Sequence, residues 1–156
     1  MSSRRAVLLA LCAMPACGFT PAFGPRRSAE GLRNQVHVIA PDTVTGFALR
    51  TAIEDQIGRA TSPVYTLTLT QREARNVAAV SAVGDTTRFD IRGAVDWVLG
   101  SESGGQVGAG TVRTFTSYSA TGSTVATQAA EADARNRLAR SLADLVVADM
   151  ILAINE

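Results

Sequence analysis

Residues 64–70 alternate strictly between apolar side chains and threonine, and this pattern constrains the fold more than any other feature of the chain. Tyr65, Leu67 and Leu69 fall on one side of an extended backbone, while the threonines fall on the other. A period of two residues is typical of a β-strand with one buried face. The segment therefore predicts a strand that is covered by other elements on one side only.

Two more strands are predicted to follow it as a meander. The first strand has room to continue through the apolar residues 77–83, and Gly84-Asp85 suits a hairpin turn. Residues 88–99 alternate again, and a glycine-rich turn at 100–105 separates them from a last strand at 106–118. In the segment 88–99 the inward side chains are Phe89, Ile91, Val95, Trp97 and Leu99, and the outward ones are Arg88, Asp90, Arg92 and Asp96.

A shorter strand and a helix are predicted before this meander. Residues 35–40 are a short β-branched run that ends at Pro41. Apolar residues then recur at helical spacing over residues 45–58, after the possible N-caps Asp42, Thr43 and Thr45. The apolar positions of this helix are Leu49, Ala52, Ile53 and Ile57, with Arg50, Glu54 and Asp55 on the other face.

A long amphipathic helix is predicted over residues 124–155. Glu131 and Arg135, and likewise Asp133 and Arg137, are spaced as favourable i,i+4 ion pairs on its solvent side. Its apolar stripe consists of Leu138, Leu142, Leu145, Val146, Met150 and Leu152. The element order β-α-β-β-β-α predicts an α+β two-layer sandwich, with two helices on one face of a small four-stranded mixed sheet. We assign residues 35–156 to this domain and residues 17–34 to a proline- and glycine-containing tether.

The N-terminus is typical of a bacterial lipoprotein signal over residues 1–16. Arg4 and Arg5 precede an apolar run that is too short to span a bilayer. Ala16 precedes Cys17, the predicted lipidated residue, whereas Cys12 follows the bulky Leu11. Residue 18 is glycine and not aspartate, so nothing at this position argues for retention in the inner membrane. We therefore expect a lipid anchor on the periplasmic face of the outer membrane. An ordinary secretory signal that contains two cysteines is the alternative.

Charge and composition exclude several function classes. Removal of Arg4 and Arg5 with the signal takes the formal net charge from +1 to −1, which does not favour nucleic-acid binding. The fifteen basic residues are all arginine, so chemistry that requires lysine is excluded and anions would be bound by guanidinium groups. Cys17 would be the only cysteine left, so we expect no disulfide within the chain.

A search for catalytic or metal-binding residues finds no convincing set. His37 is the only histidine, and no serine or cysteine motif accompanies it, so we assign it a structural or surface role. Glu54 and Asp55 are adjacent on a helix and do not face each other. The glycine-rich residues 104–110 precede a strand and not a helix, which argues against phosphate binding there. Trp97 is predicted to be a core residue, and we expect no metal and no cofactor besides the covalent lipid on Cys17.

Four segments together resemble the LptE family of lipopolysaccharide-assembly lipoproteins. They are Cys-Gly-Phe-Thr-Pro at 17–21, Val-His-Val-Ile at 36–39, Leu-Arg-Thr-Ala-Ile at 49–53 and Ala-Ala-Glu-Ala-Asp-Ala-Arg at 129–135. The resemblance implies a protein without enzyme activity that sits in the lumen of the outer-membrane β-barrel LptD. It also implies that the protein assists barrel assembly and binds lipopolysaccharide through basic residues near one end of the sheet.

The resemblance makes five arginines the candidate contacts with lipopolysaccharide or with the barrel. They are Arg72, Arg75, Arg88, Arg92 and Arg113, of which Arg72 and Arg75 fall where the alternation is irregular. The hairpin at 83–86 and the loop at 121–124, where relatives carry basic residues, have no positive charge here. Arginines on an outward strand face are also often merely solvated, with weak ion pairing.

Two other hypotheses remain open from the residues alone. The chain could be an auxiliary outer-membrane lipoprotein of another envelope lipid-transport complex, which would differ in its partner. It could also be a periplasmic enzyme, which would require a cleft of convergent titratable groups that the sequence does not show.

Overall fold

The computed structural model describes residues 29–154 and confirms the predicted α+β fold. The elements, in chain order, are α2 (Ala29–Leu32), β1 (Val36–Ile39), α3 (Val44–Ile57), β2 (Tyr65–Val80), β3 (Thr86–Ser101), β4 (Gln106–Ser119) and α4 (Thr124–Ile154). The lipoprotein signal and Cys17 lie outside the described residues.

The four strands form one mixed sheet in the order β1-β2-β3-β4. The short β1 pairs in parallel with the start of β2, with Val36 opposite Tyr65. The remaining pairs are antiparallel, so β2, β3 and β4 form the predicted meander. The parallel pair requires a crossover connection, and α3 supplies it.

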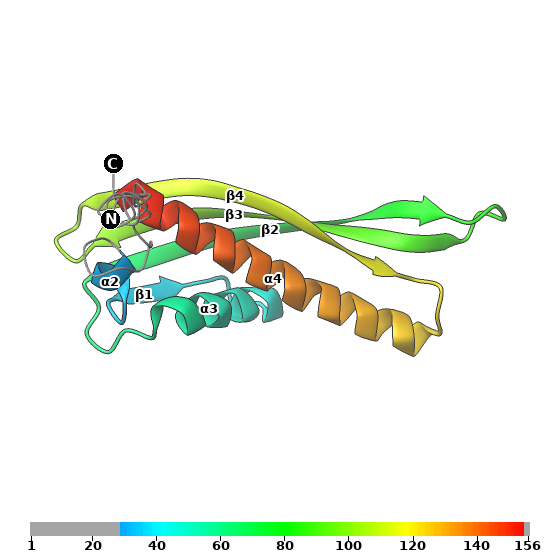
Figure 1. The fold of residues 1–156 in the computed structure, drawn as a ribbon, viewed down its shortest axis with the longest axis horizontal. Helices are drawn as coiled ribbons and strands as arrows, with labels where there is room; N and C mark the ends of the chain where they lie inside the picture. Colours follow the sequence, from blue (N-terminus) through cyan, green and yellow to red (C-terminus); the bar gives the residue numbers. More distant parts are fainter. Residues whose placement is uncertain (1–28, 155–156) are drawn as a thin grey trace, which may run out of the picture.

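Both long helices pack on the same face of this sheet (Figure 1). The helix α4 contacts β3, β4 and α3, while α3 also contacts β1. Thr43 caps α3, because its side chain accepts a hydrogen bond of 3.0 Å from the backbone N–H of Gly46. The core between the layers includes Leu49 and Ile53 of α3, Leu67, Leu69, Ile91, Val95, Trp97 and Leu99 of the sheet, and Leu138, Leu142, Val146 and Met150 of α4.

The strands β2 and β3 are longer than the alternation predicts. The strand β2 continues without a break from the threonine segment through Arg72 and Arg75 to Val80, although residues 72–80 are exposed. The β2–β3 hairpin therefore reaches past the end of β4, at the opposite end of the molecule from α2 (Figure 1). Alternation of burial stops after Leu69 because little covers either face of this extension.

Two further expectations differ from the structure. Leu145 and Leu152 belong to the predicted apolar stripe of the last helix, but they are exposed, and small residues such as Ala139 and Ala143 are buried instead. The predicted tether reaches residue 34, yet α2 lies within it and the side chain of Leu32 is buried in the core. The packed part of the chain thus includes residues before β1.

None of the helices in the described part of the chain is long and apolar enough to cross a membrane. The helix α4 has 31 residues, but charged side chains recur along it from Glu131 to Asp149.

Candidate functional site: an arginine cup on the open sheet face

The sheet face opposite the helices carries most of the candidate arginines. In β2 and β3 the buried residues have odd numbers, so even-numbered side chains such as Arg72 and Arg92 point away from α4. Arg72 pairs with Ala94 of β3, and Ala94 pairs with Arg113 of β4. Arg72, Ala94 and Arg113 therefore form one row across three neighbouring strands.

Arg92 lies beside this row and completes a shallow cavity. It is two residues from Ala94 on β3, where Ala74 and Phe115 are its cross-strand neighbours. The cavity has a volume of about 440 Å³, and its lining includes all three arginines. We call this site the arginine cup and define it by the side chains of Arg72, Ala74, Arg92, Ala94, Arg113 and Phe115.

The arginine cup has more positive than negative charge. Arg72 forms an ion pair of 2.7 Å with Asp96, which also accepts a 2.7 Å hydrogen bond from Thr111. The Thr111 hydroxyl and the Arg72 guanidinium lower the pKa of Asp96, and the charge of Arg113 adds to this effect. Among residues 29–154, neither Arg92 nor Arg113 has a carboxylate within ion-pair distance.

The floor of the cup is apolar. Ala74 and Ala94 have short side chains, so the backbone of the sheet is approachable between the arginines. Phe115, on the edge strand β4, has 62 % of its surface exposed. Apolar groups of this kind, next to unpaired cations, suit a ligand that has both an anionic and a hydrocarbon part.

Arg88 shares the open face but lies outside the cup. Its neighbours across the sheet are Ala79 of β2 and Ser119 of β4, closer to the hairpin end. Arg88 is exposed, and it does not line the cavity. Arg88 therefore differs from Arg72, Arg92 and Arg113, which converge on the cavity.

Arg75 is placed on the opposite, helix-facing side of the sheet. Its Nη1 lies 3.4 Å from both Tyr118 Oη and Glu131 Oε2, and its guanidinium carbon is 4.8 Å from the centre of the Phe89 ring. The hydrogen bond to Tyr118 and the charge of Glu131 raise the pKa of Arg75 above its ordinary value. These contacts fasten α4 to the sheet and leave Arg75 separated from the arginine cup.

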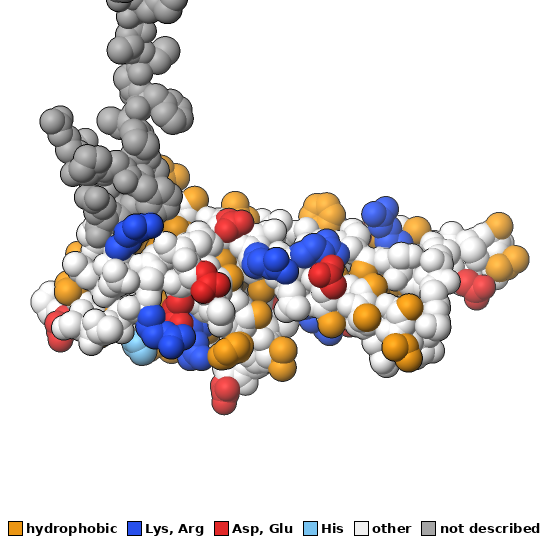
Figure 2. Space-filling model, turned by 60° about the horizontal axis from the view of Figure 1, so that its bottom comes forward, with side chains coloured by type: hydrophobic (Ala, Val, Ile, Leu, Met, Phe, Trp, Pro, Cys, Tyr) orange, Lys and Arg blue, Asp and Glu red, His pale blue; other side chains and the backbone are white. Residues whose placement is uncertain are grey.

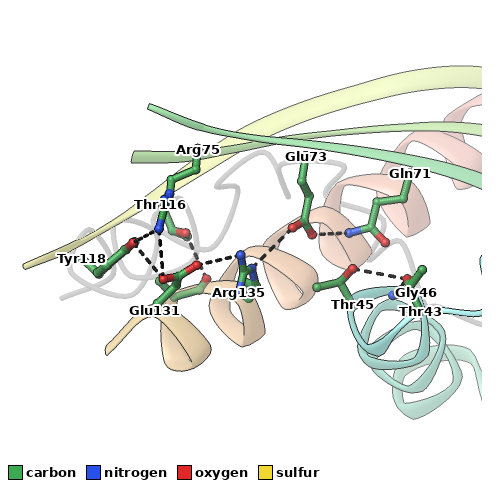
Figure 3. A network of polar contacts seen from close by, with 11 residues as sticks. Thr43, Thr45, Gly46, Gln71, Glu73, Arg75, Thr116, Tyr118, Glu131 and Arg135 are labelled. Atoms are coloured by element: carbon green, nitrogen blue, oxygen red, sulfur yellow. Dashed lines mark hydrogen bonds and ion pairs between the residues drawn. The ribbon is translucent and has the colours of Figure 1, made fainter. Parts of the chain in front are cut away.

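Arg75 belongs to a polar network that joins β2 to α4 (Figure 3). Arg135 forms an ion pair of 2.7 Å with Glu131, which confirms a predicted i,i+4 pair, and lies 3.8 Å from Glu73. Gln71 in turn donates a 2.7 Å hydrogen bond to Glu73. The second predicted pair, between Asp133 and Arg137, is confirmed at 2.8 Å.

Trp97 and His37, which the sequence also singled out, lie outside the arginine cup. Trp97 is buried as predicted, and its Nε1 donates a 2.9 Å hydrogen bond to Asp149. His37 is exposed on β1. In the described part of the chain no cluster of three or more histidine, cysteine or acidic residues could hold a metal ion.

The sequence did not indicate that alanine and phenylalanine side chains would lie next to the arginines in the sheet. Ala94, Ala74 and Phe115 acquire their significance only from the pairing of β2, β3 and β4. It also missed the exposed valines Val77, Val80 and Val83 at the hairpin end, where orange side chains are visible at one end of the molecule in Figure 2.

Comparison with protein families identifies the chain. The model of the LptE family, described as lipopolysaccharide assembly, matches residues 33–150, which include the whole sheet, α3 and most of α4. This chain belongs to the LptE family. Its role is therefore in lipopolysaccharide assembly, and the resemblance stated from the sequence is confirmed.

Solved structures share the fold of this LptE-family chain. One from Caulobacter crescentus, described as a lipoprotein, has a TM-score of 0.67 at 24 % identity and covers 81 % of this chain and 96 % of its own. The rare lipoprotein B of Shewanella oneidensis has a TM-score of 0.58 at 12 % identity, with coverages of 74 % and 92 %. A minor lipoprotein of Acinetobacter baumannii has a TM-score of 0.55 at 15 % identity, with coverages of 76 % and 89 %. No curated protein sequence matches the chain.

Proposed function

We propose that this protein is an outer-membrane lipoprotein that plugs and helps to assemble an LptD-type β-barrel. In this role it takes part in the transport of lipopolysaccharide and its insertion into the outer leaflet, without catalysing a reaction. The observation that carries the proposal is the family match over residues 33–150. The lipoprotein signal over residues 1–16, with Cys17 as the lipidated residue, supports an anchor on the periplasmic face.

The shape and surface of the domain suit a place inside a barrel. The strand β2 has 16 residues, which corresponds to a length of about 50 Å, and the body is elongated along it (Figure 1). Basic and acidic side chains are interspersed over the face in Figure 2. Because the lumen of an outer-membrane barrel is polar, such a surface can form an interface there.

We assign contacts with lipopolysaccharide or the barrel wall to the open sheet face. Arg72, Arg88, Arg92 and Arg113 are exposed on this face. Planar guanidinium groups bind both phosphates and carboxylates with paired hydrogen bonds. Arg75, which the sequence placed in the same set, lies on the helix side of the sheet and pairs with Glu131 of α4.

The proposal is tested by affinity purification of the tagged protein from its own outer membrane in a mild detergent. We expect a large β-barrel of the LptD type to co-purify in roughly stoichiometric amount, as seen by mass spectrometry. A different outer-membrane lipoprotein with the same tag serves as the control. Recovery of the protein alone, or with inner-membrane transporter subunits, would contradict the plug role and favour an auxiliary lipoprotein of another lipid-transport complex.

A further inference from the structure

We propose that the free edge of β2 is an interface with a second copy of this chain, formed by antiparallel pairing of the two β2 strands about Ala74. The inference concerns the lipoprotein outside any barrel and does not rest on the proposed function. It is carried by the unpaired backbone groups of this edge, by the order of its charges, and by the apolar hairpin at its end.

Most of β2 has one edge with no strand beside it. The strand β1 pairs with β2 only as far as Thr68, whose partner is Ile39. Residues 69–80 therefore have β3 on one side and, within residues 29–154, no strand on the other. This stretch contains no proline, and its pairing with β3 is regular up to Val77. A long and regular free edge of this kind is a template for pairing with another strand.

The backbone groups of alternate residues point out of this edge. Tyr65 donates its backbone N–H to the carbonyl of Gln35, on the side of β2 that β1 occupies. Because the direction of these groups alternates along an antiparallel pair, the N–H and C=O groups of the odd-numbered residues in 71–77 lie on the same side. An added strand would give each of these groups a hydrogen-bond partner.

The charges along the edge favour one register for self-pairing. With Ala74 of one copy opposite Ala74 of the other, Glu73 of each copy lies opposite Arg75 of its neighbour. A centre at Glu73 would instead place two glutamates opposite each other, and a centre at Arg75 would place two arginines opposite each other. Opposite charges directly across a sheet are favourable and like charges are unfavourable. The charges therefore select the register centred on Ala74.

Glu73 and Arg75 are positioned for such pairing. Both side chains point to the helix side of the sheet (Figure 3). Their ion pairs with α4 are long, since Arg75 Nη1 lies 3.4 Å from Glu131 Oε2 and Glu73 Oε2 lies 3.8 Å from Arg135 Nε. The side chain of Arg75 is 52 % exposed. A guanidinium group has five N–H donors, so Arg75 can accept a second carboxylate without releasing Glu131.

The register centred on Ala74 uses nearly the whole free edge. Residues 69–79 of one copy would face residues 79–69 of the other, and the odd-numbered residues in 71–77 would exchange about eight backbone hydrogen bonds. The next residue, Val80, would lie opposite Thr68, where Ile39 already occupies the edge. Val80 is 60 % exposed and Ile39 is 45 % exposed. Each end of the pairing would therefore bring together exposed apolar side chains of the two copies.

The other free edge of the sheet, along β4, is less suited to self-pairing. Arg137 Nη2 donates a 3.2 Å hydrogen bond to the backbone carbonyl of Ser117, which closes part of that edge. A centre at Arg113, in the middle of β4, would place two arginines opposite each other. The edge of β2 is therefore the one that we assign to the second copy.

Disulfide formation at the centre of the pair tests the proposal in the full mature lipoprotein. Ala74→Cys would place two thiols at a residue pair without backbone hydrogen bonds, where the Cα atoms lie about 4.5 Å apart. This separation is within the range that a disulfide spans. The purified variant, in an excess of non-ionic detergent micelles over protein, is oxidised with copper phenanthroline. The disulfide-linked dimer is then measured on a non-reducing gel.

Asn76→Cys is the matched control, because residue 76 is exposed on the same strand and the same face. In the proposed register it lies opposite Arg72, roughly 14 Å along the strand from residue 76 of the second copy. The wild type, whose mature form would keep only Cys17, gives the background. We expect Ala74→Cys to form at least about fivefold more dimer than Asn76→Cys. Equal dimer from both variants would show random collision and overturn the proposal, as would no dimer from Ala74→Cys above the background.

Charge exchange separates a contact between copies from one within the chain. In the Ala74→Cys background, Glu73→Arg should lower the amount of dimer by about fivefold or more, because two arginines would then face each other. The exchange E73R/R75E should restore the dimer, although within the chain it places like charges beside Arg135 and Glu131 of α4. Restoration can therefore come only from the second copy.

Thermal unfolding of each variant establishes that it is folded before the dimers are compared. A folded E73R/R75E variant that fails to restore the dimer would overturn the register. None of these measurements involves a barrel, so failure of the proposed plug role would be seen separately.

Discussion

Glycines at two positions of the sheet allow α4 to approach it closely. A Cβ atom on Gly93 would lie 2.8 Å from Leu142 Cδ1, and one on Gly110 would lie 2.7 Å from Trp97 Nε1 and would also meet the Asp149 carboxylate. At Gly110, therefore, the absence of a side chain makes room for the partly buried hydrogen bond between Trp97 and Asp149. Breaking this hydrogen bond is costly because the indole N–H of the buried Trp97 would then lack a partner.

The residue-scale prediction is that Gly110→Ala destabilises the domain. The added methyl group must push Trp97 or Asp149 aside, which should lower the free energy of unfolding by about 1–3 kcal/mol. Chemical denaturation monitored by tryptophan fluorescence measures this change. Gly105→Ala is the control, since its nearest atom would be 3.7 Å away and the stability should hardly change. Identical midpoints for the two variants would refute the close-packing argument.

Packing against the sheet and α3 decides which residues of α4 are buried. Its buried side is wider than the stripe of large residues, since Ala134, Ala139 and Ala143 pack against the sheet and α3. Leu145 and Leu152 face away from both layers and remain exposed. Residues on the same helix can therefore differ greatly in their contribution to stability, and sequence spacing alone did not separate Leu142 from Leu145.

At the scale of the element, we predict that Leu142→Asp prevents stable folding while Leu145→Asp is tolerated. Leu142 is fully buried between the layers, and a charge there would cost several kcal/mol, a large part of the stability of about 5–15 kcal/mol typical of a domain. The melting temperatures of the two variants, measured by circular dichroism, check this. An unchanged melting temperature for Leu142→Asp would mean that this face of α4 is not buried.

The two ends of the molecule differ in the elements that they carry. The helix α2, which follows the segment bearing Cys17, lies at one end, and the apolar β2–β3 hairpin lies at the other (Figure 1). The arginine cup lies between them on the face that carries no helix. In the proposed arrangement the anchor attaches one end to the membrane while the open face stays available.

The prediction for the whole molecule concerns this anchor. Cys17→Ser should abolish labelling by a fatty-acid probe and release the protein from the membrane fraction, because the several acyl chains of a lipoprotein supply the attachment. Cys12→Ser is the matched control, since Cys12 would be removed with the signal, and its labelling should persist. Labelling that survives in Cys17→Ser would contradict the assignment of the lipidated residue.

The sequence by itself determined the order of the elements and the inward face of each well-alternating strand. Leu67, Leu69, Ile91, Val95 and Trp97 are buried as their spacing predicts, because a period of two is a local property of an extended chain. Where the alternation is absent, the sequence does not predict which face of the sheet a side chain lies on. Beyond Leu69 the alternation in β2 is lost, so Arg72 and Arg75 could not be assigned to opposite faces.

Only the tertiary structure decided which arginines lie together. Arg72, Arg92 and Arg113 are far apart in the chain, and they meet because the register of two antiparallel pairs places Ala94 between them. Register depends on pairing and packing across strands, and a slip of one residue would move every side chain to the other face. The charges of the site could therefore be listed from the sequence, but their convergence is a consequence of the assembled sheet.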